Sequence, residues 1–168
     1  GGVLAALTIC ALAVVPSASA FVYWADTSND TIGRANNDGS APNDAFIHTG
    51  ALPIQVAVDA EHVYWANQNG NSIGRARIDG SEANNSFIAG IVEPSGIAVN
   101  GSSIFWSTLP GPIGRANLNG TEPKPKLITA ATEPCGLALD GGHVYWANDS
   151  HSGANIGRAG LDGSVPQP

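Results

Sequence analysis

An aromatic pair recurs four times along this chain at almost equal intervals. Its tryptophans are 41, 41 and 40 residues apart. Equal spacing near 40 residues indicates one structural unit that is repeated along the chain. The four pairs are Tyr23-Trp24, Tyr64-Trp65, Phe105-Trp106 and Tyr145-Trp146.

Each pair is the start of a series of short strand-like runs. These runs are separated by residues that favour turns. The pair is followed by Ile-Gly-Arg-Ala, then by Asp-Gly or Asn-Gly, a short apolar run, a proline and a further apolar run such as residues 53–59. Runs of β-branched, aromatic or alternating residues predict strands, and Asp-Gly and Asn-Gly supply the positive φ of tight hairpins. No segment after residue 20 shows a helical period over ten residues.

Four antiparallel strands in about 40 residues predict one blade of a β-propeller. Leucine-rich repeats are shorter, and helical repeats need apolar helices that this pattern lacks. Neighbouring residues of a strand point to opposite faces, so one ring of each pair should pack on the preceding blade and the other on the following blade. The run after the proline is expected to be the innermost strand, where small residues suit the crowded axis. The expected fold class is therefore all-β, a propeller of four-stranded antiparallel blades.

The repeat resembles the YWTD repeat of the low-density-lipoprotein-receptor class of propellers. That family's pattern runs Tyr-Trp-Thr-Asp, Ile-x-Arg-x-x-Leu-Asp-Gly and Pro-x-Gly-Leu-Ala-Val-Asp before the next Tyr-Trp. The resemblance covers residues 21–168, with Ala or Ser in place of the family's Thr and with its Asp kept only as Asp26. The most similar copy is Tyr64-Trp65, Ile73-Gly-Arg75, Ile78-Asp79-Gly80, Pro94-Ser-Gly96-Ile-Ala-Val99 and Phe105-Trp106.

The resemblance implies a ring of six blades, which at this period needs about 240 residues. The repeats predict fourteen strands, in groups of three, four, four and three. We therefore expect an incomplete propeller, about three and a half blades of six, whose first unit lacks its inner strand and whose fourth lacks its outer strand. We expect further blades after residue 168; a four-bladed ring or an open arc with exposed strand edges are the alternatives.

The first twenty residues differ from the repeat. They carry no charge, and a mostly apolar run of 13 residues (3–15) is too short to span a bilayer. The run ends in Pro-Ser-Ala-Ser-Ala, a pattern of small residues that signal peptidases cleave. We predict a secretory signal peptide over residues 1–20 and the partial propeller over residues 21–168. The mature chain should be secreted, periplasmic or on the cell surface, without membrane insertion.

The overall charge narrows the range of partners. The net charge is −7 and the isoelectric point is near 4.8. A nucleic-acid surface needs stripes of Lys and Arg, so nucleic acid is not an expected partner. Only Cys135 remains after cleavage at residue 20, so no internal disulfide is expected.

One arginine recurs at the same place in every unit. The four side chains form either a ring of cations for an anion or, as we expect, clamps within the third strands that bond to blade carbonyls or to the polar residue after Tyr-Trp. Third strands lie away from the axis, where their side chains do not easily converge on one ligand. The residues are Arg34, Arg75, Arg115 and Arg158.

Other polar residues also recur, and each has a structural explanation beside a functional one. His62 and His143 are expected to open second strands, because a zinc or iron site needs three or four ligands around one point. Asp59, Asn100 and Asp140 are expected to form Asx-turns. Calcium is coordinated by six to eight oxygens, and the spacing of these three residues alone does not bring that many together. No metal ligand and no cofactor is therefore predicted. We expect Cys135 to be a small residue near the axis.

No catalytic residue is predicted, because Ser-His-Asp and Cys-His constellations and nucleotide-binding motifs are absent from the sequence. The loops between second and third strands differ between units, and they should share one face with the crossings at residues 93–94 and 133–134. Unequal loops on a repeated scaffold indicate recognition. We therefore expect an exported, non-catalytic module that binds a protein or carbohydrate. The candidate binding residues are Asn67, Gln68, Asn69, Glu93, Glu133, Asn148, Asp149 and His151.

The alternative function is that of an enzyme. Lactonases and lyases on related six-bladed folds hold a metal at the channel with Glu, Asp and Asn from several blades. Glu93 and Glu133 are candidates for such a set. A third possibility is a repeat that only packs within a larger surface protein.

Overall fold

The described residues of this chain fold into β-strands and turns. A computed structural model describes residues 13–14, 21–109, 111–148 and 155–167, and these contain fifteen strands. In this part of the chain, no helix has the length and apolar character that crossing a membrane requires.

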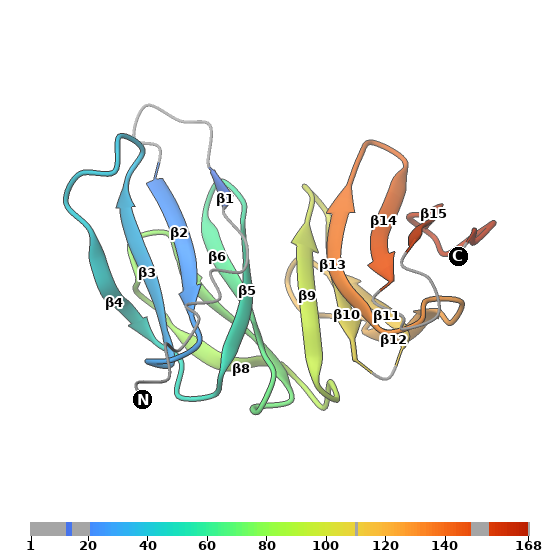
Figure 1. The fold of residues 1–168 in the computed structure, drawn as a ribbon, viewed down its shortest axis with the longest axis horizontal. Coiled ribbons are helices and arrows are strands. Elements are labelled where there is room, and N and C mark those ends of the chain that lie inside the picture. Colours follow the sequence, from blue (N-terminus) through green and yellow to red (C-terminus); the bar gives the residue numbers. More distant parts are fainter. Residues whose placement is uncertain (1–12, 15–20, 110, 149–154, 168) are drawn as a thin grey trace, which may run out of the picture.

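The strands form four separate antiparallel sheets, each built from consecutive strands (Figure 1). We call these sheets blades one to four. Blade one holds β1 (Ala13–Val14), β2 (Phe21–Asp26), β3 (Thr31–Asn36) and β4 (Asn43–His48). Blade two holds β5 (Pro53–Val58), β6 (His62–Asn67), β7 (Ser72–Arg77) and β8 (Asn84–Ala89). Blade three holds β9 (Pro94–Val99), β10 (Ser103–Thr108), β11 (Ile113–Asn117) and β12 (Lys124–Ile128), and blade four holds β13 (Pro134–Leu139), β14 (His143–Asn148) and β15 (Asn155–Gly160).

The first strands of the blades lie side by side in chain order. β1 contacts β5, β5 contacts β9, and β9 contacts β13. Figure 1 shows β5, β9 and β13 toward the middle of the molecule, with β4 at its margin. The runs after the prolines are therefore the innermost strands, as predicted, and the sheets are arranged as propeller blades.

The ends of the repeat differ in part from the prediction. The first blade was expected to lack its inner strand, but Ala13–Val14 of the predicted signal peptide pairs with β2 and brings the count to fifteen rather than fourteen. The physical reason is that the edge of β2 presents backbone groups to which an extended segment can bond. Blade four has three strands, as predicted, and Gln167 forms a single bridge with Arg158. The signal peptide itself stays a prediction.

Strand register explains the glycine in every Ile-Gly-Arg-Ala run. Each tryptophan of a second strand is paired with that glycine of the third strand, as Trp65 is with Gly74. A Cβ atom on Gly74 would lie 2.2 Å from the indole of Trp65, and the other three glycines are just as close to their tryptophans. The indole therefore lies flat over the third strand, and only a residue without a side chain leaves room for it.

The aromatic pairs join successive blades. We call the side of a blade that carries its tryptophan the tryptophan face and the opposite side the tyrosine face. Tyr23 of blade one packs in one cluster with Trp65 of blade two, Tyr64 with Trp106, and Phe105 with Trp146. Each tyrosine face thus packs on the tryptophan face of the following blade. This confirms the prediction that the two rings of a pair pack on different neighbours, and it shows which ring takes which side.

We expect Gly74→Ala to destabilise the fold by about 1–3 kcal/mol, because the added methyl group would displace the buried Trp65 indole. Gly101→Ala is the matched control, since a Cβ there would meet no described atom within 4 Å. Urea unfolding of the two variants measures the difference. Equal stabilities would show that the indole does not depend on the glycine.

Candidate functional site

The two ends of the blades carry different connections. The loops between second and third strands and the crossings from outer to inner strands share one end, which we call the loop face; it is the lower end in Figure 1. The tight turns between first and second strands and between third and fourth strands share the other end, the turn face. This is the arrangement that the sequence predicted for the variable loops.

A polar side chain at the end of a loop holds the neighbouring crossing on the loop face. Asp30 Oδ1 accepts the N–H of Leu52 at 2.7 Å, and Asn71 Oδ1 accepts the N–H of Glu93 at 2.9 Å. Leu52 and Glu93 adopt left-handed backbone conformations with φ of 53° and 44°, which are uncommon for residues with side chains. These bonds hold an otherwise strained crossing in one shape. Sequence reasoning missed Asp30 and Asn71, although both stand two residues before an Ile-Gly-Arg run.

The structure separates the predicted binding residues into two groups. Asn69, Glu93 and Glu133 are exposed on the loop face, while Gln68 is half-buried. The backbone N–H of Gln68 donates to the Leu52 carbonyl at 3.0 Å. These residues remain available to a partner.

Two of the three predicted asparagines, Asn67 and Asn148, are internal. Asn67 is 0% exposed and donates to the carbonyl of Asn85 at 2.9 Å. Asn148 is 5% exposed, and its Oδ1 accepts the N–H of Thr132 at 2.9 Å. The Asn67 amide joins β6 to β8, and that of Asn148 joins β14 to the crossing before β13, so we leave both out of the candidate surface. The two other predicted residues, Asp149 and His151, lie outside the described residues.

A hollow of about 660 Å³ opens on the loop face between blades two and three. Val92, which lines the hollow, is 59% exposed, and Leu109, which follows the lining residue Thr108 in the sequence, is 37% exposed. The N–H of Leu109 donates to the carbonyl of Glu93 at 3.1 Å, which joins the loop of blade three to the crossing from blade two. Residues that line the hollow include Gly90, Val92, Trp106, Thr108, Pro112 and Lys126.

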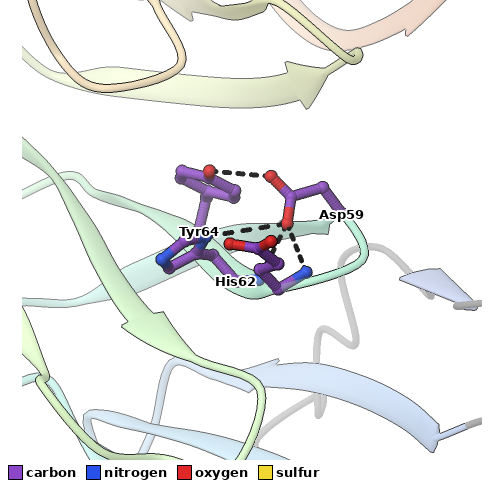
Figure 2. Close-up of polar contacts among 4 residues, drawn as sticks. Asp59, His62 and Tyr64 are labelled. Atoms are coloured by element: carbon purple, nitrogen blue, oxygen red, sulfur yellow. Dashed lines mark hydrogen bonds and ion pairs between the residues drawn. The ribbon is translucent and has the colours of Figure 1, made fainter.

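A second hollow, of about 450 Å³, lies on the turn face, and its lining includes Asp59, Tyr64, Arg75 and Leu118. Figure 2 shows how Asp59 organises one wall of it. Asp59 Oδ1 accepts the N–H groups of Glu61 at 2.8 Å and His62 at 2.7 Å, and its Oδ2 accepts the hydroxyl of Tyr64 at 2.9 Å. Burial and the hydrogen bond to the Asp59 carboxylate raise the pKa of Tyr64, so its hydroxyl stays protonated as a donor.

The same arrangement occurs again in blade four. Asp140 Oδ1 accepts the N–H of Gly142 at 2.7 Å and of His143 at 2.6 Å, while its Oδ2 accepts the hydroxyl of Tyr145 at 2.8 Å. In blade three Asn100 accepts the corresponding backbone N–H groups. The predicted Asx-turns are therefore confirmed. Because the arrangement belongs to the repeat, it supports the hairpin turn rather than a reaction.

The recurring arginines bond within or between neighbouring blades. Arg34 donates to the carbonyl of Ile78 in blade two at 3.2 Å, as the clamp hypothesis predicts. Its guanidinium also lies 4.3 Å from the centre of the Phe21 ring and 4.1 Å from that of Phe46. Such stacking satisfies a half-buried cation, and the sequence analysis did not foresee it.

The other arginines find different partners. Arg75 lies 3.9 Å from the centre of the Phe87 ring. Arg115 donates to the Ser103 hydroxyl at 2.9 and 2.8 Å, and Arg158 donates to the side chain of Gln167 at 3.1 Å. The polar partner of Arg115 is therefore Ser103, at the start of the second strand of blade three. The prediction had placed such a partner after the aromatic pair. Each of the four arginines therefore contacts residues of its own blade or of the next blade.

In the described parts of the chain, no group of three or more His, Cys, Asp or Glu side chains is arranged to hold a metal ion. The described geometry therefore assigns no third ligand to stand with Glu93 and Glu133.

Comparisons with known proteins show the fold and no more. No family model matches the chain, and no curated protein matches it. Among solved structures, one of a nidogen/laminin complex matches with a TM-score of 0.63 at 18% identity, over 94% of this chain and 78% of that one. An inactive H270A virginiamycin B lyase from Staphylococcus aureus with quinupristin matches with a TM-score of 0.68 at 18% identity, over 98% of this chain and 59% of that one. The computationally designed protein Ika4 matches with a TM-score of 0.60 at 12% identity, over 88% and 90%.

These similarities make the chain part of a β-propeller. It spans little more than half the length of the lyase chain. The fold is thus shared by proteins with different activities, and the activity has to be argued from the site.

The Asx-turn of blade four gives a pH prediction. The N–H of Gly142, the hydroxyl of Tyr145 and the N–H of His143 lower the pKa of Asp140 from its ordinary 3.8 to about 2. Since this pKa is lower in the folded chain, the carboxylate stabilises the fold above pH 3.8, and the contribution is lost as the pH falls toward 2. Carbon-13 NMR titration should show the low pKa. Tyr145→Phe should raise it, because one donor is lost; a titration near 4 in the unmodified chain would contradict the geometry.

Proposed function

We propose that this chain is an exported, non-catalytic, YWTD-like propeller that binds a protein partner through the loop face of blades two and three. The observation that supports this most directly is the hollow lined by exposed Val92, with exposed Leu109 next to the lining residue Thr108 in the sequence. An exposed apolar patch beside a hollow is typical of a protein-binding surface, where a side chain of the partner fills the hollow as an anchor.

The chemistry of the surface favours protein over carbohydrate. Sugar rings stack on exposed aromatic faces, yet Trp106, the aromatic residue in the wall of the hollow, is 1% exposed. The exposed apolar groups beside the hollow are aliphatic. They suit an aliphatic or aromatic side chain of a protein loop, and Asn69 and Glu93 can bond to its backbone.

The loop face also has the rigidity that recognition needs. The bonds from Asp30 and Asn71 fix the crossings before any partner arrives. Loops that are already ordered lose less conformational entropy on binding, so more of the contact energy appears as affinity. The nidogen structure was determined with laminin, a protein partner of a chain with this fold.

The remaining parts of the proposal rest on the sequence. The register of the aromatic pairs and the Ile-Gly-Arg runs supports the YWTD relationship. The uncharged apolar stretch before residue 20 supports export, and the net charge of −7 disfavours nucleic acid as a partner.

Replacing the apolar residues of the loop face should weaken partner binding. We expect Val92→Asp and Leu109→Asp each to weaken binding to peptides selected from a displayed library by tenfold or more, because a carboxylate does not enter an apolar hollow without cost. Val165→Asp is the control, since Val165 is 76% exposed but lies on the turn face. Surface plasmon resonance on the three variants measures the effect.

Two outcomes would replace this proposal. Binding to a glycan array but to no peptide would make carbohydrate the partner. Divalent metal bound to the purified chain, with hydrolysis of a lactone that Glu93→Gln abolishes, would establish the enzyme alternative.

A further inference from the structure

We infer that the loop-face hollow between blades two and three binds a tyrosine side chain of the protein partner, with its ring against the apolar wall and its hydroxyl on the Pro125 carbonyl. This tyrosine belongs to the partner of the proposed function, on which the inference rests. We call the contact between two successive blades a seam. The hollow exists because blade three lacks side chains that close the same place in the preceding seam.

The seam between blades one and two is closed by polar side chains of blade two. The amide of Asn67 and the hydroxyl of Ser72 both donate to the carbonyl of Asn85, at 2.9 and 2.8 Å. The side chain of Asn85 in turn donates to the carbonyl of His48 in blade one at 3.3 Å. Asn67 and Ser72 are 0% and 1% exposed. These side chains therefore occupy the space between the end of β6 and β8.

Blade three has other residues at these three places. Counted from the tryptophan and the isoleucines of the repeat, the residues that stand there are Thr108, Pro112 and Pro125, in place of Asn67, Ser72 and Asn85. Proline has neither a backbone N–H nor a side-chain donor, and the Thr108 hydroxyl donates to the Pro112 carbonyl at 3.0 Å. All three residues line the hollow of about 660 Å³. The hollow therefore opens where the polar side chains of the preceding seam are missing.

One backbone acceptor beside the hollow lacks the side-chain donor that it has in the other blades. The Thr31 hydroxyl donates to the Asp44 carbonyl at 2.7 Å in blade one, as that of Ser72 does to the Asn85 carbonyl in blade two. The corresponding carbonyl in blade three is that of Pro125, and no side chain in the described part of the chain donates to it. This carbonyl is therefore available to a donor from a partner.

The wall of the hollow is mostly apolar and carries one cation. Val92 is 59% exposed, while Ile91 and Trp106 form the buried part of the wall at 4% and 1%. Lys126 also lines the hollow and is exposed. None of the ion pairs among the described residues involves its ammonium group. An occupant therefore needs an apolar body and a group that is attracted to a positive charge.

A tyrosine side chain has this combination of properties. Its ring is a large apolar body with a negative face, its O–H can donate to the Pro125 carbonyl, and its oxygen can accept from Lys126. An ammonium group near an aromatic ring adds a cation–π attraction. A phenylalanine lacks the donor, and a primary amide has the donor but little apolar surface to bury. A carboxylate would lose its hydration against the apolar wall, and a second cation would be repelled by Lys126.

The first test uses the full chain and the peptides that it selects from the displayed library. These peptides should share a tyrosine. Replacing that tyrosine by phenylalanine in the tightest peptide should weaken binding about tenfold, because one hydrogen bond is lost. Replacing it by alanine should weaken binding about thirtyfold or more, because the anchor is lost. Surface plasmon resonance measures both changes.

The second test gives blade three the residues of blade two. Thr108→Asn combined with Pro112→Ser should close the hollow, weaken the tyrosine peptide by about tenfold or more, and abolish its advantage over the phenylalanine peptide. Circular dichroism and urea unfolding should show a fold at least as stable, since the same residue types close the preceding seam. Thr121→Asn is the matched control, because Thr121 is exposed on the turn face of the same blade; it should bind both peptides as the parent chain does.

The outcomes separate the tyrosine anchor from the proposed function. Selected peptides without a shared tyrosine, equal affinity for the tyrosine and phenylalanine peptides, or unchanged binding by the variant with Thr108→Asn and Pro112→Ser would overturn the anchor. If Val92→Asp still weakened those peptides, the loop-face site would stand without it. A parent chain that binds no peptide of the library would overturn the proposed function and the anchor with it.

Discussion

The contact between a tryptophan and a strand glycine supports the rest of the structure. In each blade the indole lies over the glycine of the third strand. In blades two to four it also meets the tyrosine face of the blade before it. Burying an indole removes about 200 Å² from water, worth up to about 5 kcal/mol. The buried Nε1 groups of Trp65, Trp106 and Trp146 have no hydrogen-bond acceptor among the described residues, a cost of about 1–3 kcal/mol each. Apolar burial therefore exceeds the polar penalty, and blades stack because of it.

That stacking leaves the two ends of the blades free to differ. Asx-turns around Asp59, Asn100 and Asp140 give the turn face a regular architecture. On the loop face the segments vary in length and composition, although Asp30 and Asn71 hold the crossings in place. The repeated residues thus build the scaffold, and the segments that differ between blades lie on the loop face, where a partner would be recognised. The Val92–Leu109 patch arises from this irregularity.

Periodicity made the fold predictable before any coordinates. Equal tryptophan spacing, turn dipeptides and prolines predicted four-stranded blades, the innermost strands and the opposite directions of each aromatic pair, and the structure confirms all three. The clamp was predicted for all four arginines, but among the described residues the bond to a carbonyl forms at Arg34, whose partner Ile78 belongs to the next blade. The stack of Arg34 on Phe46 of the outer strand was not predicted. The pairing of Ala13–Val14 with β2 was missed, since a leader pattern describes cleavage and not what an open strand edge will accept.

The sequence by itself determined the repeating unit of this protein. It gave the length of the repeat, its strands and the residues that pack one blade against the next. These follow from local rules, because alternation along a strand and turn chemistry act over a few residues. Only the tertiary structure decided which polar residues face a partner. Asn67 and Asn69 are two positions apart and equally polar, yet one is buried and bonded to β8 while the other is exposed. Exposure depends on segments from other blades, and no local pattern records where those segments come to lie.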